Sequence, residues 1–167
     1  MKKRFIATLL VLGVLLTGCT VMNTQKEIAA AVEAELPRAE EISSKDSHGG
    51  FQGDGLEVTV LQFESDVIGP QLEGSAGWHR LPLSQPMQIL LYGVETDQES
   101  DGPYLSDDRG MPLLPQVEHG YYFFRDRHSE STDPYDDSAI YDRYSFNLTA
   151  AVFDTDTNRL YFVSFDT

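Results

Sequence analysis

The C-terminal end of the chain contains two strand-like runs separated by a polar turn, and the first of them alternates apolar and polar side chains. In the first run Phe146, Leu148, Ala150 and Val152 share one parity, and the second run extends from Leu160 to Phe165. A period of two is typical of strands with one buried face, and two such runs joined by a short turn predict an antiparallel hairpin. The chain is therefore expected to fold around a sheet.

Three further segments favour strands. Residues 56–63 alternate and then shift phase at Leu61, which indicates a bulge or burial on both faces. The runs Met87 to Tyr92 and Tyr121 to Phe124 are short and apolar on both faces, as central strands are. No internal repeat accompanies these segments.

A helix is predicted near the start of the chain, from about Gln25 to Leu36. Thr24-Gln25-Lys26-Glu27 has the form of a capping box, Ile28 and Val32 begin an apolar face with a spacing of four, and Pro37 ends the pattern. The absence of βαβ alternation predicts an α+β domain, with the N-terminal helix packed on an antiparallel sheet of four to five strands that ends in the C-terminal hairpin.

The first nineteen residues have the plan of a secretory signal. A basic start precedes an apolar run from Phe5 to Leu16, which at twelve residues is too short to span a bilayer, and Thr17-Gly18-Cys19 follows. Leu16-Thr17-Gly18-Cys19 resembles the lipobox of bacterial lipoproteins.

That resemblance implies a diacylglyceryl thioether on Cys19 and cleavage after Gly18. The expected organisation is a signal peptide over 1–18, a lipidated tether over 19–23 and a single α+β domain over 24–167. The expected location is the extracytoplasmic face of the cell membrane, or the outer membrane in a Gram-negative envelope. Cys19 is the only cysteine, so no disulfide is expected and an apolar core must supply stability.

The chain is strongly acidic, with a formal net charge of −15. Loss of Lys2, Lys3 and Arg4 with the signal segment changes that charge to −18. Such a surface repels phosphates, which argues against nucleic acid as a partner, and it favours a cationic protein or peptide. The same charge is also explained by solubility alone.

The loop from Arg125 to Asp142 carries the most suggestive group of polar side chains. We single out Asp126, His128, Glu130 and Asp133 as a candidate metal site, because carboxylate oxygens suit Ca²⁺ and the imidazole suits zinc or manganese. The alternative is a solvated loop whose carboxylates pair with Arg125, Arg127 and Arg143. A partner-binding surface is the third interpretation.

Three other stretches resemble functional motifs, but each lacks residues that the motif requires. The glycine-rich stretch 48–55 lacks the Lys-Ser/Thr of a phosphate loop, residues 154–165 lack the glycine and glutamate of a calcium loop, and Ser75 lacks a nucleophile elbow. No catalytic residue is predicted, and a non-enzymatic domain is expected.

The aromatic residues allow two interpretations. Trp78-His79-Arg80 together with Tyr104, Tyr135, Tyr141 and Tyr144 is either an exposed recognition patch or, for Trp78, part of the core, which we favour. Residues 120–167, and more loosely 49–55, resemble proteins of Gram-positive bacteria that share an Arg-His-Ser-Glu-Ser-Thr-Asp-Pro-type stretch before a terminal hairpin. That resemblance implies no function.

The sequence thus predicts a membrane-anchored lipoprotein with a binding or interaction domain of unknown ligand. The alternative is a Ca²⁺- or transition-metal-binding domain, or a metal-dependent enzyme, centred on Asp126, His128 and Glu130.

Overall fold

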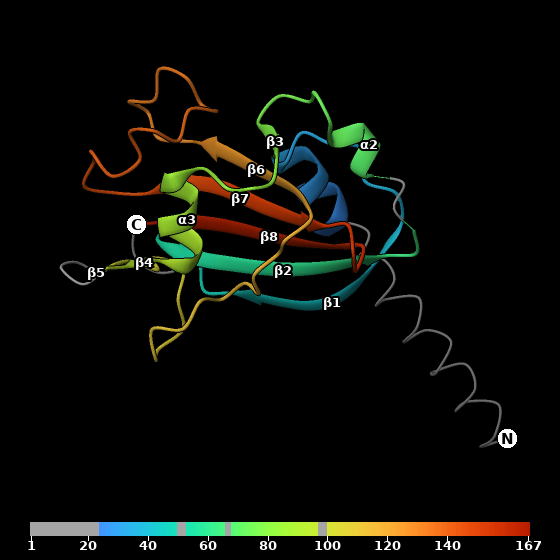
Figure 1. Cartoon of the computed structure of the whole chain (residues 1–167), viewed down its shortest axis with the longest axis horizontal. Helices are drawn as coiled ribbons and strands as arrows, with labels where there is room; N and C mark the ends of the chain where they lie inside the picture. Colours follow the sequence, from blue (N-terminus) through green and yellow to red (C-terminus); the bar gives the residue numbers. More distant parts are fainter. Residues whose placement is uncertain (1–23, 50–52, 66–67, 97–99) are drawn as a thin grey trace, which may run out of the picture.

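The protein is an α+β structure dominated by one antiparallel sheet (Figure 1). The computed structural model describes residues 24–49, 53–65, 68–96 and 100–167. The main sheet has six strands in the order β1-β2-β8-β7-β6-β3, and β4 and β5 form a separate pair. The elements are β1 (Ala39–Asp46), β2 (Gly55–Phe63), α2 (Gly69–Leu72), β3 (Trp78–Arg80), α3 (Gln85–Tyr92), β4 (Val94–Glu95), β5 (Ser100–Asp101), β6 (Gly120–Asp126), β7 (Asn147–Asp154) and β8 (Arg159–Asp166).

The C-terminal hairpin is confirmed, and it forms the centre of the sheet. Strand β7 pairs with β8 from Asn147 opposite Asp166 to Asp154 opposite Arg159. In the turn between them the Asp154 carboxylate accepts a hydrogen bond from the backbone N–H of Asp156 at 2.8 Å. Asn158 closes the turn with φ 55°, a left-handed conformation that asparagine tolerates better than most residues.

The sheet is buried on both faces, so it separates two apolar cores. We call face A the side that carries Leu61, Phe153 and Phe162, and face B the side that carries Val152 and Val163. Alternation along β7 and β8 divides their side chains between these faces. The two-sided burial explains why β2, which pairs with β8, changes phase in its apolar pattern.

Different segments cover the two faces. Residues 24–31 are helical, and Ile28 in this segment and Val32 just after it are buried in the core of face A, together with Leu72 of α2. Face B is covered by α3, whose Met87, Leu90 and Leu91 are buried among the strands. Within the described residues no helix is long and apolar enough to cross a bilayer. The predicted signal segment and Cys19 lie outside the described residues.

The predicted strand from Met87 to Tyr92 is wrong, because these residues form most of α3. The Ser84 side chain accepts a hydrogen bond from Met87 N, and Pro86 occupies the first turn, where no backbone N–H is needed. Gly93 ends the helix with φ 72°. A buried helix of eight residues contains no more residues than an ordinary strand, so neither the number of residues nor the apolar pattern distinguished the two.

The sheet also has more strands than the four to five predicted. Strand β1 occupies Ala39–Asp46, a segment for which the sequence predicted no strand. As an edge strand it is mostly exposed, so its side chains show no apolar alternation. An irregularity between Glu41 and Ser43 interrupts its pairing with β2, as is common at sheet edges. Strand β3, at the opposite edge, has only three residues.

Candidate functional site

The loop that carries the predicted site residues leaves the sheet at the end of β6. Asp126, the last residue of that strand, is 6% exposed, and its Oδ2 pairs with Nη2 of Arg143. Its Oδ1 accepts a hydrogen bond from His128 N at 3.0 Å. The carboxylate therefore fixes both the start and the end of the loop, because Arg143 lies four residues before β7.

Short-range hydrogen bonds shape the rest of the loop. Nδ1 of His128 accepts from the backbone N–H of Glu130 at 3.2 Å, so this nitrogen is engaged within the loop. Oδ1 of Asp133 accepts from Tyr135 N at 3.0 Å. Ser138 donates to the Asp136 carboxylate through its backbone N–H at 2.9 Å, and this bond holds the pKa of Asp136 below its usual value. Such turns are the ordinary use of Asp in loops.

Three of the four predicted site residues line one cavity of about 230 Å³. Asp126, Glu130 and Asp133 belong to its wall, whereas His128 does not. Asp142 was not among the predicted site residues, and Arg143 was named only as a possible ion-pair partner. Both contribute to the wall, at the end of the loop from Arg125 to Asp142, which we call the acidic loop. The complete lining is Asp126, Glu130, Ser131, Thr132, Asp133, Asp136, Ala139, Asp142 and Arg143. We call this the acidic cavity.

The charges around the acidic cavity do not balance. Its single cationic side chain, Arg143, is paired with Asp126, and no described cationic side chain lies within ion-pair distance of the four other carboxylates. Arg125 pairs with Glu33 at 2.8 Å and Arg127 with Asp166 at 2.9 Å, both outside the cavity. Of the three arginines that the sequence offered as internal partners, only Arg143 neutralises a carboxylate of the loop.

The described residues include no group of three or more His, Cys, Asp or Glu side chains arranged to hold a metal ion. The carboxylates of the acidic cavity line a common space without converging on one point. Metal binding by Asp126, His128, Glu130 and Asp133 stays a prediction.

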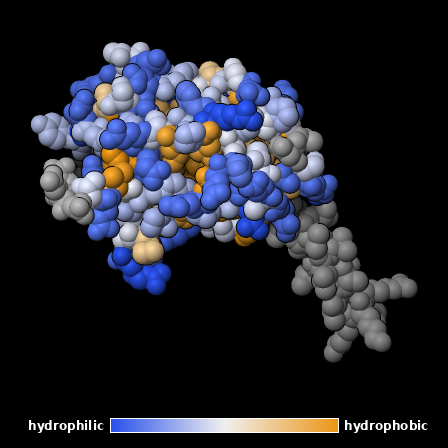
Figure 2. Space-filling model, viewed as in Figure 1, coloured by the Kyte–Doolittle hydropathy of each residue, from blue (hydrophilic) through white to orange (hydrophobic). Residues whose placement is uncertain are grey.

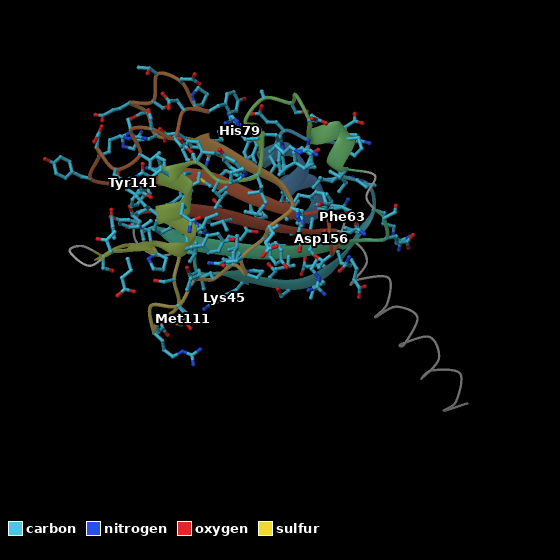
Figure 3. All side chains as sticks on the ribbon, viewed as in Figure 1. Lys45, Phe63, His79, Met111, Tyr141 and Asp156 are labelled. Atoms are coloured by element: carbon cyan, nitrogen blue, oxygen red, sulfur yellow. The ribbon has the colours of Figure 1, made fainter. Side chains whose placement is uncertain are left out.

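The aromatic residues divide between core and surface. Trp78 is 5% exposed and its Nε1 donates to Val32 O at 2.9 Å, which confirms that it belongs to the core. Tyr104 and Tyr141 stack with ring centroids 5.1 Å apart, and Tyr144 is fully exposed. Tyr141 lies beside α3 (Figure 3), where its hydroxyl donates to Pro86 O at 2.8 Å. Tyr135 and Tyr141 therefore lie within the acidic loop and Tyr144 just after it, whereas Trp78 does not join them.

Comparison with protein-family models, curated proteins and solved structures finds no match for this chain.

Proposed function

We propose that this chain is a lipid-anchored, extracytoplasmic binding protein whose acidic cavity receives a basic segment of a protein or peptide. The observation that carries the proposal is the charge imbalance of that cavity, where four carboxylates surround a space with no described cation left to neutralise them. A lysine or arginine side chain of a partner supplies the missing charge.

The remaining surface supports the same class of partner. The chain has 27 acidic and 12 basic residues, and four of the arginines that the structure describes are within 3.1 Å of a carboxylate of the same chain. Most of the visible face is hydrophilic, with apolar atoms confined to small patches (Figure 2). A surface of this kind attracts cations by long-range electrostatics and repels nucleic acids.

The proposed location at the membrane is based on Leu16-Thr17-Gly18-Cys19, which resembles a lipobox. In the proposal, residues 1–18 are removed, Cys19 carries the diacylglycerol and residues 19–23 form a short tether. The N-terminal helix then packs on the sheet of a single domain over 24–167. Two or more acyl chains hold a protein firmly at a membrane, whereas one chain binds only marginally.

The test measures binding of a fluorescent hexa-arginine peptide to membranes that carry the full chain. We expect affinity to fall steeply between 50 and 500 mM NaCl, because salt screens exposed charges over about 10 Å at 0.1 M. Replacing Glu130, Asp133 and Asp136 by their amides is expected to weaken binding at least tenfold. The matched control replaces Glu40, Glu41 and Glu118, which lie outside the acidic cavity and remove the same charge.

Three results contradict the proposal. Equal loss in both triple variants assigns binding to net charge and not to the acidic cavity. A Cys19→Ser chain that keeps peptide binding in the membrane fraction contradicts the anchor. If Ca²⁺, Mn²⁺ or Zn²⁺ instead raises the melting midpoint of the chain and EDTA reverses this rise, the acidic cavity is assigned to a divalent cation and not to a basic segment.

A further inference from the structure

On face A, one row of paired residues is polar and follows rows that are mostly apolar. Glu57 of β2 lies opposite Ser164 of β8, Ser164 lies opposite Thr149 of β7, and Thr149 lies opposite Arg125 of β6. In the row before it, Thr59 faces Phe162 and Phe162 faces Ala151. Neighbouring strands are about 4.8 Å apart, so the polar row crosses the sheet over about 15 Å.

A cleft of about 240 Å³ opens at this boundary, between the helical segment 24–31 and the sheet. The helical segment covers the apolar rows through the buried Ile28, and its exposed Glu27 borders the cleft. The strands contribute Glu57, Thr149, Phe162 and Ser164, and Arg127 follows β6. None of these residues belongs to the acidic cavity.

The cleft contains a guanidinium group that is fixed in place. Nε of Arg127 donates to Thr149 Oγ1 at 3.1 Å, and Nη2 donates to Leu148 O, Ser164 Oγ and Asp166 Oδ2 at 2.9 to 3.0 Å. No described residue accepts a hydrogen bond from Nη1. Because the side chain is already ordered, a bound anion costs little additional conformational entropy.

Glu57 supplies a negative group in the same cleft. Thr59 Oγ1 donates to its Oε1 at 3.1 Å, and no described cation lies within ion-pair distance of its carboxylate. Burial raises the pKa of Glu57 above its usual value. A cation placed beside this carboxylate relieves the cost of burying its charge.

We propose that this cleft binds a small zwitterion of the size of a free amino acid, with its carboxylate on Arg127 and its ammonium group between Glu57 and Glu27. Phe162 and Ile28 offer apolar surface to the remainder of the ligand. The volume of the cleft is about 240 Å³. It lies below the roughly 300–1,000 Å³ of pockets for drug-sized ligands, which matches a ligand of this size.

The test is thermal melting and calorimetry of the full chain in mild detergent with the twenty free amino acids, one at a time. We expect at least one to raise the melting midpoint and to bind with a measurable Kd. Acetate and methylammonium, which carry only one of the two charges, are expected to give no shift at the same concentration. Failure of all twenty amino acids at 10 mM overturns the proposal.

Matched variants assign the binding to the cleft. Glu57→Gln and Glu27→Gln are each expected to weaken binding at least tenfold. Glu57 is half-buried, so if Glu57→Gln fails to fold, the variant of the exposed Glu27 still tests the cleft. Glu40→Gln, on the edge strand β1, is expected to leave the Kd unchanged. The triple amide variant of the acidic cavity is also expected to retain amino-acid binding, so this inference and the proposed function fail separately. Unchanged binding in both cleft variants overturns the inference.

Discussion

At the scale of single residues, Glu33 combines backbone strain with two side-chain contacts. Its φ of 52° is left-handed, in the position after the helical segment 24–31 that glycine usually occupies. The bond from Ala34 N to Ala29 O closes this helix end. Oε1 of Glu33 pairs with Arg125 at 2.8 Å, and Oε2 accepts from the Tyr135 hydroxyl at 2.6 Å. The contacts explain why a residue other than glycine is tolerated here.

Two substitutions separate the strain from the contacts. Glu33→Ala loses both contacts and keeps the strain, whereas Glu33→Gly loses the contacts and relieves it. We expect Glu33→Ala to be the less stable variant by about 1 kcal/mol, the typical cost of a left-handed residue that is not glycine. Urea unfolding measures the difference. Equal stability of the two variants would show that φ at this position relaxes.

At the scale of elements, α3 depends on its start as much as on its apolar face. Ser84 Oγ accepts from Met87 N at 3.3 Å and also donates to the carboxylate of Asp137, in the acidic loop. The cap therefore connects the helix on face B to the loop that surrounds the acidic cavity. Sequence patterns alone do not reveal this connection, because Ser84 and Asp137 are 53 residues apart.

Replacing Ser84 by alanine removes an N-cap, and we expect a loss of about 1 kcal/mol in the free energy of unfolding. Amide hydrogen exchange is expected to rise first in α3. Ser84→Thr is the control, because threonine keeps a hydroxyl that accepts the same bond. If the threonine variant loses as much stability as the alanine variant, the cap is not the cause.

The elements that the sequence predicted well are those with one or two clearly apolar faces. The alternation of β2 and β7 and the apolar runs of β6 and β8 identified the centre of the sheet. Strand β1 was missed because an edge strand with both faces near solvent has no apolar pattern. The segment that forms α3 was predicted as a strand, because a buried apolar run of eight residues has the same pattern in a helix and in a strand.

The candidate site was predictable only in part, for a related reason. Asp126, Glu130 and Asp133 could be singled out because they lie within eight residues of one another in the sequence, and the structure places all three in the wall of one cavity. The cleft on face A was not predicted, because Glu57, Arg127 and Ser164 come from distant segments of the sequence that only the sheet order brings together. Long-range pairing of this kind is not encoded in local spacing.

At the scale of the whole molecule, one histidine joins the ends of two strands, β1 and β8. Nδ1 of His48 lies 2.6 Å from Asp46 Oδ1, and Nε2 lies 3.2 Å from Asp166 Oδ2 near the C-terminus. Asp166 also pairs with Arg127 of the cleft. A neutral imidazole has a single N–H, so only the protonated ring donates to both carboxylates.

This arrangement predicts how stability depends on pH. Burial alone lowers the pKa of His48, but the hydrogen bonds to Asp46 and Asp166 outweigh it, so the pKa lies above its usual value of 6.5. A group with a raised pKa contributes its full stability below the unfolded value and loses it as pH rises through the folded value. We therefore expect the free energy of unfolding to fall as pH increases from about 6.5 toward 9.

The measurement is urea unfolding across that range in 0.15 M salt, for the full chain and for His48→Gln. The variant is expected to show a flatter dependence on pH, because glutamine does not titrate. His119→Gln is the matched control: its ring pairs with Asp156 at 2.8 Å on an exposed surface, where such pairs contribute little. If the slope is the same in His48→Gln as in the parent chain, protonation of His48 does not link the ends of β1 and β8.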